Sequence, residues 1–565
     1  MRRTRAHFKR ALRLCRENEA QNRADALSAN LMSNNHPQFW KTIKSLSPKS
    51  KTTAQKIGNA VGEEAISNFW ADHFDSILNC IDDRESLHRV NELLSVNSPI
   101  EDRFSPEDIQ TAIKHLSGNK SAGCDGLPSE AYKHAHPIIH ELLAALYNAC
   151  ILHRFLPESL LLIHLIPLLK NKLKDHSDPG NYRPIAITTI SSKILESVLL
   201  VKLEPYLHTT DNQFGFKADH STDACIYLLK EIINFYTASG SPVFLCFVDV
   251  RKAFDRVNYN KLFIKLFERG APLHVIGLLR FWFSTQKFCV LWGNTLSRSF
   301  GSANGLRQGG ILSPHLFNVY TDDLNHQLNA LPIGCLVNGL CINNLCYADD
   351  MVLISPSAMG LQSLINCCYN YAEMHDIIYN ETKTQCMRIN SGPYDFRVPS
   401  ITLGEHQLEF VTEFPYLGHI ITNDQRDNLD IEHRRRKLCA LGNMITRQYA
   451  FCNRDTKLSL FRSFCYNVYG SHLWTSFTQE QFRRLKVTHN DILRRLTYTP
   501  RFHSASAMFA ACHLRSIKEI IRYSMASLTH RLQRSANSIV QNVLLSGARH
   551  ISKMWQLWER EAFVP

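Results

Sequence analysis

The chain has 565 residues, of which 44% are hydrophobic, and a formal net charge of +13. This length predicts two or more domains or subdomains with substantial cores. The apolar stretch 160–169 is too short to cross a bilayer, and the 17 cysteines show no C-x-x-C pair or zinc spacing. Composition therefore excludes a membrane protein and a disulfide scaffold, and we expect an intracellular protein with reduced thiols.

The N-terminal region is basic and has a helical pattern. Residues 1–16 contain seven Lys/Arg and no acidic residue, which indicates an arm that contacts nucleic acid. Phe39, Trp40 and Ile43 are the expected packing residues. A first boundary is predicted near residue 100, and nothing before it supplies a His/Asp/Glu set typical of a nuclease.

Two short apolar segments follow in the first half of the chain. Residues 166–170 and 181–187 flank a polar insert and are predicted to be two strands joined by a loop. Lys170 ends the first of these segments and Arg183 lies in the second. Without further context, both would be interpreted as solvent-facing charges.

Aspartates stand at the ends of two later apolar runs. Residues 243–248 predict a buried strand followed by Asp249, and residues 347–354 predict a hairpin whose turn is Asp349–Asp350. If the two ends meet, like charges crowd one point and require cations. Mg²⁺ prefers oxygen ligands, so nucleotidyl transfer by two metal ions is indicated. Either element alone is more often structural than catalytic, because an Asp-Asp turn and an Asp at the end of a strand are both ordinary turn chemistry.

A glycine-rich segment lies between the two acidic positions. Paired Gly309 and Gly310 let the backbone approach a ligand, and Ser313-Pro314 predicts the start of a helix. A plain turn before a core helix is the alternative interpretation.

The last quarter of the chain holds the excess of positive charge. Residues 426–565 contain 23 Lys/Arg and 9 Asp/Glu, a net charge of +14. Leu458, Phe461, Cys465 and Val468 recur at helical spacing and predict a core stripe. The basic cluster 433–437 is expected either to contact phosphates or to face solvent.

In this order, the motifs resemble the reverse transcriptases of LINE-type (non-LTR) retrotransposons. The similar segments cover nearly the whole chain: 121–128, 166–187, 213–222, 247–255 (motif A), 307–318 (motif B), 347–350 (motif C), 380–384 (motif D), 416–418 (primer grip), 457–474 and 493–501. One departure is Lys217, where the family usually has arginine. The resemblance implies an α+β right-hand polymerase, with fingers and palm built on antiparallel sheet and followed by a helical thumb. The expected domains are 1–100, 101–421 and 422–565, without the N-terminal endonuclease.

The resemblance also implies the roles of the site residues. Two Mg²⁺ ions, or Mn²⁺, would be held by Asp249, Asp349, Asp350 and the Val250 carbonyl. The other residues implied to act are Lys170 and Arg183 on the triphosphate, Gln308 and Gly309 near the nascent base pair, Phe254 beneath the sugar, Lys383 as the acid for pyrophosphate, and Tyr416, Leu417 and Gly418 on the primer.

The expected function is RNA-directed DNA synthesis in the nucleus. The expected partners are an RNA template, a DNA primer or nicked target DNA, and deoxynucleoside triphosphates. Three alternatives stay open: a catalytically inactive or domesticated nucleic-acid-binding scaffold, a group II intron-like maturase, and a viral RNA-dependent RNA polymerase.

Overall fold

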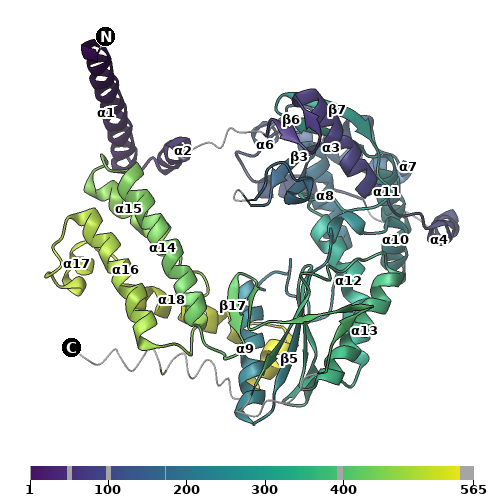
Figure 1. Ribbon diagram of the computed structural model, residues 1–565. Helices are drawn as coiled ribbons and strands as arrows, with labels where there is room; N and C mark the ends of the chain where they lie inside the picture. The colour runs from purple at the N-terminus through teal and green to yellow at the C-terminus, as the bar shows by residue number, and fades with distance from the viewer. Residues whose placement is uncertain are drawn as a thin grey trace.

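The computed structural model describes residues 2–46, 54–96, 103–171, 174–390, 399–546 and Gln556. Its elements follow an open arc, with a sheet at the base, a second sheet and helices on one arm, and helices alone on the other (Figure 1). The predicted α+β right-hand arrangement of palm, fingers and thumb is confirmed. The boundary predicted near residue 100 lies outside the described residues.

The palm is built on a five-stranded sheet in the order β10-β11-β5-β12-β15. The strands are β5 (Val243–Val248), β10 (Asn344–Tyr347), β11 (Asp350–Ser355), β12 (Gln385–Ile389) and β15 (Glu409–Phe410). All pairs are antiparallel except β12 with β15. All six residues of β5 are buried, which confirms the predicted strand.

Alternate residues of β5 pack on opposite faces of the sheet. Phe244, Cys246 and Val248 join the core formed with α12 (Ser313–Ala330) and α13 (Ala358–Met374). The intervening apolar residues join the core formed with α9 (Thr222–Ala238), α18 (Ile517–Gln533) and α19 (Ser538–Leu545). Two-sided burial explains why this strand is a continuous apolar run.

The fingers contain a four-stranded sheet in the order β4-β3-β6-β7. Its strands are β3 (Leu162–Leu169), β4 (Tyr182–Ile187), β6 (Lys287–Trp292) and β7 (Thr295–Phe300). The antiparallel pairing of β3 with β4 confirms the predicted strand, loop and strand. The neighbouring helices are α3 (Glu63–Leu78), α4 (Arg84–Ser95), α5 (Pro106–His115), α6 (Ser129–Lys133), α7 (Ile138–His153), α8 (Ile190–Leu203), α10 (Tyr259–Glu268) and α11 (Leu273–Thr285).

The remaining strands form small hairpins. They are β1 (Lys56–Ile57) with β2 (Ala60–Val61), β8 (Cys335–Val337) with β9 (Leu340–Ile342), β13 (Thr402–Leu403) with β14 (His406–Gln407), and β16 (Glu413–Tyr416) with β17 (His419–Thr422). The last of these hairpins carries the predicted primer grip in its turn.

The thumb consists of α14 (Asn428–Gln448), α15 (Arg454–Cys465), α16 (Gln479–Thr497) and α17 (Ala505–Ala511). The predicted stripe is confirmed, with Phe461, Cys465 and Val468 buried and Leu458 packed against them. Helix α18 begins in this core and ends in the palm core. Helices α18 (Ile517–Gln533) and α19 (Ser538–Leu545) therefore return the chain to the palm and pack in its core.

The N-terminal region is shared between the two arms. Ala24 and Leu27 of α1 (Arg2–Met32), and Phe39 and Ile43 of α2 (His36–Leu46), pack in the thumb core. Helix α3 instead packs on the fingers sheet. The predicted division at residue 100 stays a prediction, and packing sets the first two helices apart from the next two.

A buried cluster of charged side chains joins the thumb to the palm. Lys230 of α9 lies 2.5 Å from Asp427, and Asp430 lies 3.1 Å from Arg434. His419 of β17 stands between the two carboxylates, at 3.5 Å and 3.3 Å. Burial alone would raise the pKa of Asp427, but Lys230 and His419 outweigh it and hold that pKa well below its usual value.

Arg434 corrects one expectation for the basic cluster. Its guanidinium is buried, donates to the Gly418 carbonyl and lies over the Tyr469 ring, so it cannot contact phosphate. Arg435 pairs with the half-buried Glu432, and Arg436 reaches the same carboxylate from an exposed position. The face of α14 that carries Asp430 and Arg434 therefore stabilises the fold and does not bind nucleic acid.

The described helices include none with the length and apolar character of a membrane-spanning segment. None of the 17 cysteines, all of which lie in described residues, forms a disulfide, as expected.

Arg434→Met should destabilise the protein by about 3–5 kcal/mol, because it leaves Asp430 buried without its partner. Arg436→Met, on the same helix with a side chain 76% exposed, is the matched control and should change stability by no more than about 0.5 kcal/mol. Urea unfolding curves of the two variants test this difference. Equal midpoints would show that Arg434 is dispensable.

Candidate active site

The three aspartates lie where β5 ends and β11 begins. Val248 pairs with Met351, and the same register places Asp249 opposite Asp350. The turn joining β10 to β11 is Ala348–Asp349, closed by the pair Tyr347 and Asp350. The predicted Asp349–Asp350 turn is thus wrong by one residue, because Ala348 takes the left-handed conformation, with φ of 58°.

Electrostatic repulsion marks this meeting point. Asp349 and Asp350 keep contact with solvent, but the protein atoms around them remove much of their hydration. This loss is the largest cause of the raised pKa of Asp349 and of the pKa of Asp350, which is raised to about 6. The Asp249 carboxylate contributes to both shifts and the Asp349 carboxylate to that of Asp350, whereas Arg183 opposes both.

The donor set fits a hard divalent cation in chemistry. Carboxylate oxygens are the ligands that Mg²⁺ prefers. The pairing of Val250 with Tyr379 uses the Asp249 carbonyl and the Arg251 N–H, so the Val250 carbonyl takes no part in it. In the described part of the chain, no three His, Cys, Asp or Glu side chains form a metal cage by themselves. An ion here would take further ligands from water and substrate phosphate.

The loop after α13 supports Asp249 from one side. The Asn380 N–H donates to the Asp249 carbonyl at 2.7 Å, and the Asp249 N–H donates to Thr384 Oγ1 at 3.2 Å. Lys383 Nζ lies 3.7 Å from Asp249 Oδ2 and its side chain is 65% exposed. The structure therefore brings the predicted acid Lys383 to the aspartates.

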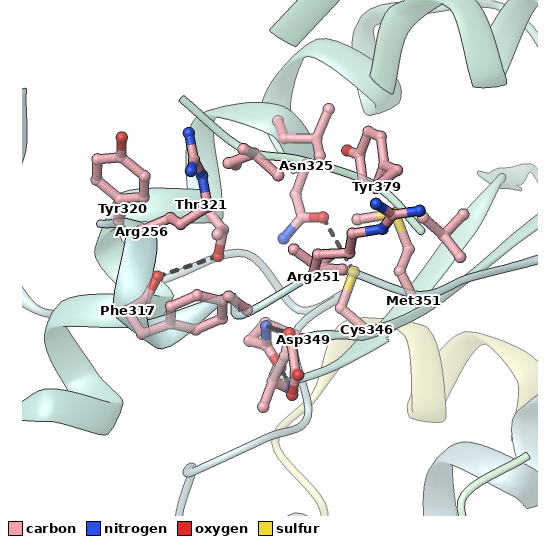
Figure 2. Close-up of a pocket in the computed structure, with 17 residues that line it drawn as sticks. Arg251, Arg256, Phe317, Tyr320, Thr321, Asn325, Cys346, Asp349, Met351 and Tyr379 are labelled. Carbon is pink, nitrogen blue, oxygen red and sulfur yellow. Dashed lines mark hydrogen bonds between the residues drawn. The ribbon is translucent and has the colours of Figure 1, made fainter. Parts of the chain in front are cut away.

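The primer-grip turn faces the same space. A cavity of about 370 Å³ is lined by Asp249, Asp350, Lys383, Tyr416 and Leu417, among others. A second, small cavity of about 30 Å³ is lined by Asp349, Arg251 and Phe317, among others (Figure 2). The first cavity thus joins two of the aspartates to the predicted primer grip.

The primer-grip turn is held by the thumb. Leu417 and Gly418 both have positive φ, at 46° and 81°. Tyr469 Oη donates to the Leu417 carbonyl at 2.8 Å, and Arg434 holds the next carbonyl. Tyr416 points inward, with Oη 3.2 Å from Cys225 Sγ. The backbone of Leu417 and Gly418 is therefore fixed in this turn by the thumb.

The fingers cations lie on paired strands. Leu168 pairs with Arg183, whose side chain is exposed, and Lys170 follows at the end of β3. Lys170 Nζ donates to the Gly180 carbonyl at 2.9 Å. Loss of hydration lowers the pKa of Lys170, and the nearby Arg183 and Lys383 lower it further. The two fingers cations and Lys383 thus share one electrostatic environment.

Phe254 belongs to a small aromatic cluster beside the aspartates. Its ring stacks on Phe317 at 4.5 Å and 12°, and Phe216 meets it edge-on at 6.2 Å. The ring is half-buried, so one part remains available to a ligand.

The glycine-rich segment joins palm to fingers. Gln308 Nε2 donates to Asp255 Oδ1 at 3.0 Å, and the Gln308 carbonyl accepts from the Ala186 N–H at 2.8 Å. Burial raises the pKa of Asp255 to about 6, against the Gln308 hydrogen bond. Gly309 has φ of 116°, and a Cβ there would lie 3.0 Å from the Ala186 carbonyl. This position therefore favours glycine.

Glu196 is a site-supporting residue that the sequence analysis missed. From α8 it pairs with Arg307 at 3.1 Å, both side chains being 4% exposed, and accepts from the Leu312 N–H at 3.2 Å and from the Ile311 N–H. Arg307 also lies 4.4 Å from the Trp282 ring centroid. The pair fixes the backbone on both sides of Gln308. An acid inside an apolar helix was the available signal, since such a group needs a partner.

Lys217 also serves the fold. Its ammonium donates to the carbonyls of Thr209 and Thr210 at 2.9 Å and 2.6 Å. A bidentate contact of the kind arginine makes with a carboxylate is not formed there.

Proteins with similar sequences include RNA-directed DNA polymerases of mobile elements. Residues 170–421 match the family described as reverse transcriptase (RNA-dependent DNA polymerase). A probable RNA-directed DNA polymerase from transposon BS of Drosophila melanogaster is 25% identical over 90% of this chain and 58% of its own length. The RNA-directed DNA polymerase from mobile element jockey of Drosophila funebris is 21% identical over 94% of this chain and 60% of its own length. The chain thus spans somewhat over half the length of these relatives.

Among solved structures, apo telomerase from Candida tropicalis, truncated from its C-terminal domain, superposes with a TM-score of 0.33. The match has 11% identity and covers 50% of this chain and 59% of that one.

Asp350→Asn should flatten the pH dependence of folding stability. Because the pKa of Asp350 is raised from 3.8 to about 6 in the folded protein, the folded state binds a proton first as pH falls. Stability of the unsubstituted protein should therefore rise as pH falls through about 6 toward 3.8, and the variant should lack this contribution and be the more stable at pH 7.

Urea midpoints in metal-free buffer at pH 7, 6 and 5 measure the effect. Asp82→Asn, at a carboxylate whose side chain is 76% exposed, is the control. Parallel curves for Asp350→Asn and the unsubstituted protein would contradict the expectation.

Proposed function

We propose that this chain, whose residues 170–421 belong to the reverse transcriptase (RNA-dependent DNA polymerase) family, synthesises DNA on an RNA template. Its relatives of the non-LTR retrotransposon type are named RNA-directed DNA polymerases. The observation that carries the proposal is the cavity that joins Asp249 and Asp350 to Lys383 and the primer-grip turn. Carboxylates crowded at such a place serve nucleotidyl transfer better than passive binding.

Asp249, Asp349 and Asp350, with the Val250 carbonyl, would hold two Mg²⁺ ions, and Mn²⁺ is a chemical substitute. Bound there, the metal ions supply a lowered pKa for the primer hydroxyl and charge neutralisation for the triphosphate. The raised pKa of Asp350 supports this role, because a bound cation stabilises the ionised carboxylate against both the loss of hydration and the repulsion from Asp349 and Asp249.

The cations of the fingers and palm would orient the triphosphate. Arg183 is exposed on β4 and its fork geometry suits phosphate oxygens. Lys170 would add charge from the end of β3. Lys383, whose ammonium lies 3.7 Å from Asp249 Oδ2, would donate a proton to the departing pyrophosphate.

The palm would recognise the nucleotide through its shape. Gln308 and Gly309 lie between palm and fingers, where the new base pair would form. Phe254, stacked on Phe317, would lie beneath the sugar and exclude a 2′-hydroxyl.

The primer-grip turn and the thumb would hold the nucleic acid. Tyr416 and Leu417 line the cavity and would contact the primer, and Gly418 would complete the turn that holds them there. Exposed lysines and arginines of the thumb would contact phosphates of a duplex between the RNA template and a DNA primer or nicked target. We place this activity in the nucleus, where a target DNA would be met.

Asp249→Asn or Asp349→Asn should abolish Mg²⁺-dependent primer extension on an RNA template, while binding of that template stays nearly unchanged. The aspartates would hold the metal ions, whereas the basic surfaces hold phosphate. Primer extension with deoxynucleotides and filter binding measure the two properties, and Asp82→Asn is the control. Full extension by either variant would refute the assignment, and no extension by the unsubstituted protein would favour a non-catalytic scaffold.

Phe254→Val should keep most incorporation of deoxynucleotides and raise that of ribonucleotides, because the ring would no longer oppose a 2′-hydroxyl. Phe267→Val, in α10, is the control and should leave the ratio unchanged. Single-nucleotide incorporation with both substrates provides the ratio of efficiencies. If Phe254 were only a packing residue, the variant would lose on the order of one to a few kcal/mol of stability and both substrates would suffer alike.

A further inference from the structure

The side chain of Gln213 holds the turn that carries Asp349. Its Oε1 accepts from the Ala348 N–H at 2.8 Å, and its Nε2 donates to the Ala348 carbonyl at 3.2 Å. Both backbone groups of the one left-handed residue in the turn are thus fixed by a single buried amide. A non-glycine residue adopts this conformation only where its surroundings impose it.

Gly215 allows the turn to approach closely. A Cβ at this position would lie 2.3 Å from the Ala348 nitrogen, a distance that no side chain can occupy. The Gly215 N–H donates to Gln213 Oε1 at 2.8 Å, and Asn318 of α12 donates to the Gly215 carbonyl at 2.8 Å. The backbone of this segment is therefore packed directly against the turn.

The segment that contains Gln213 and Gly215, residues 211–215, is itself anchored on two sides. The Phe214 N–H donates to the Cys346 carbonyl and the Cys346 N–H donates to the Asn212 carbonyl, each at 2.8 Å. Asn537, which caps α19, donates to the Asp211 carbonyl at 2.8 Å. The N-terminal cap of α19 thus holds residues 211–215, and these residues contact the turn that carries Asp349.

We infer that Gln213 and Gly215 are positioning residues that set the conformation of residues 347–350, and hence the direction in which Asp349 presents its carboxylate. This inference rests on the proposed function for its catalytic consequence. A misplacement on the order of 1 Å at a reacting centre can lower the rate about 100-fold. Both residues contact the backbone of Ala348 in the turn, so the inference concerns the placement of Asp349.

The chain contains a matched control for Gln213. Gln362 makes the same pair of bonds to the backbone of Thr402, donating at 2.8 Å and accepting at 2.8 Å, on a helix and hairpin outside the site. Gly301 is the control for Gly215, since a Cβ there meets nothing closer than 3.9 Å. We compare Gln213→Met with Gln362→Met, and Gly215→Ala with Gly301→Ala, in the full chain.

Two measurements separate the conformation of the turn from catalysis. Hydrogen–deuterium exchange of peptides spanning residues 344–351 reports the turn without requiring activity. Primer extension gives kcat and the KM for the nucleotide. For Gln213→Met and Gly215→Ala we expect faster exchange in these peptides and a kcat lowered about 100-fold, with a smaller change in KM. Both controls should match the unsubstituted protein.

Unchanged exchange in both site variants would overturn the inference, as would altered exchange with full kcat. If the unsubstituted protein does not extend a primer, the proposed function is refuted instead. Hydrogen–deuterium exchange would still show whether Gln213 and Gly215 set the conformation of residues 347–350. Should Gly215→Ala fail to fold, Gln213→Met alone supplies both readings, because it keeps the size of the side chain.

Discussion

The pairing of β5 with β11 is the constraint on which the site depends. Because β5 is buried on both faces, a shift of one residue would move each apolar side chain to the opposite core. The register is therefore fixed, and the acids that follow are carried to one point although they repel. Packing of helices on both sides of the sheet supplies the free energy that holds like charges together.

Cations surround this point at different depths and do different work. Lys383 stands next to Asp249, and the fingers bring Lys170 and Arg183 to the same field. Other cations lie inside the protein: Arg307 and Arg434 are buried and hold backbone segments in place. Arg434 and the buried Lys457 lie in the C-terminal quarter, so the net charge of that quarter overstates the charge available to nucleic acid. Exposure rather than composition identifies the residues that can contact phosphate.

Elements whose conformation depends on residues close in sequence were predicted correctly. The strand at 243–248 and the paired strands of the fingers followed from apolar runs and turn residues. The turn at 348–349 was misplaced by one residue because its conformation is imposed by Gln213, 135 residues earlier. The inward orientation of Arg434 and the partner of Glu196 likewise depend on groups distant in sequence or on the packing of several elements. Such contacts leave no periodic signal in one sequence.

The shared placement of the N-terminal region limits how far the two arms can part. Helix α2 ends at Leu46 in the thumb, and the chain is next described at Ala54, before the hairpin that packs with the fingers. Eight residue steps can span at most about 29 Å when fully extended. Leu46 and Ala54 can therefore separate by no more than that distance. Any opening of the thumb away from the fingers must stop at that separation or unpack α2 from the thumb core.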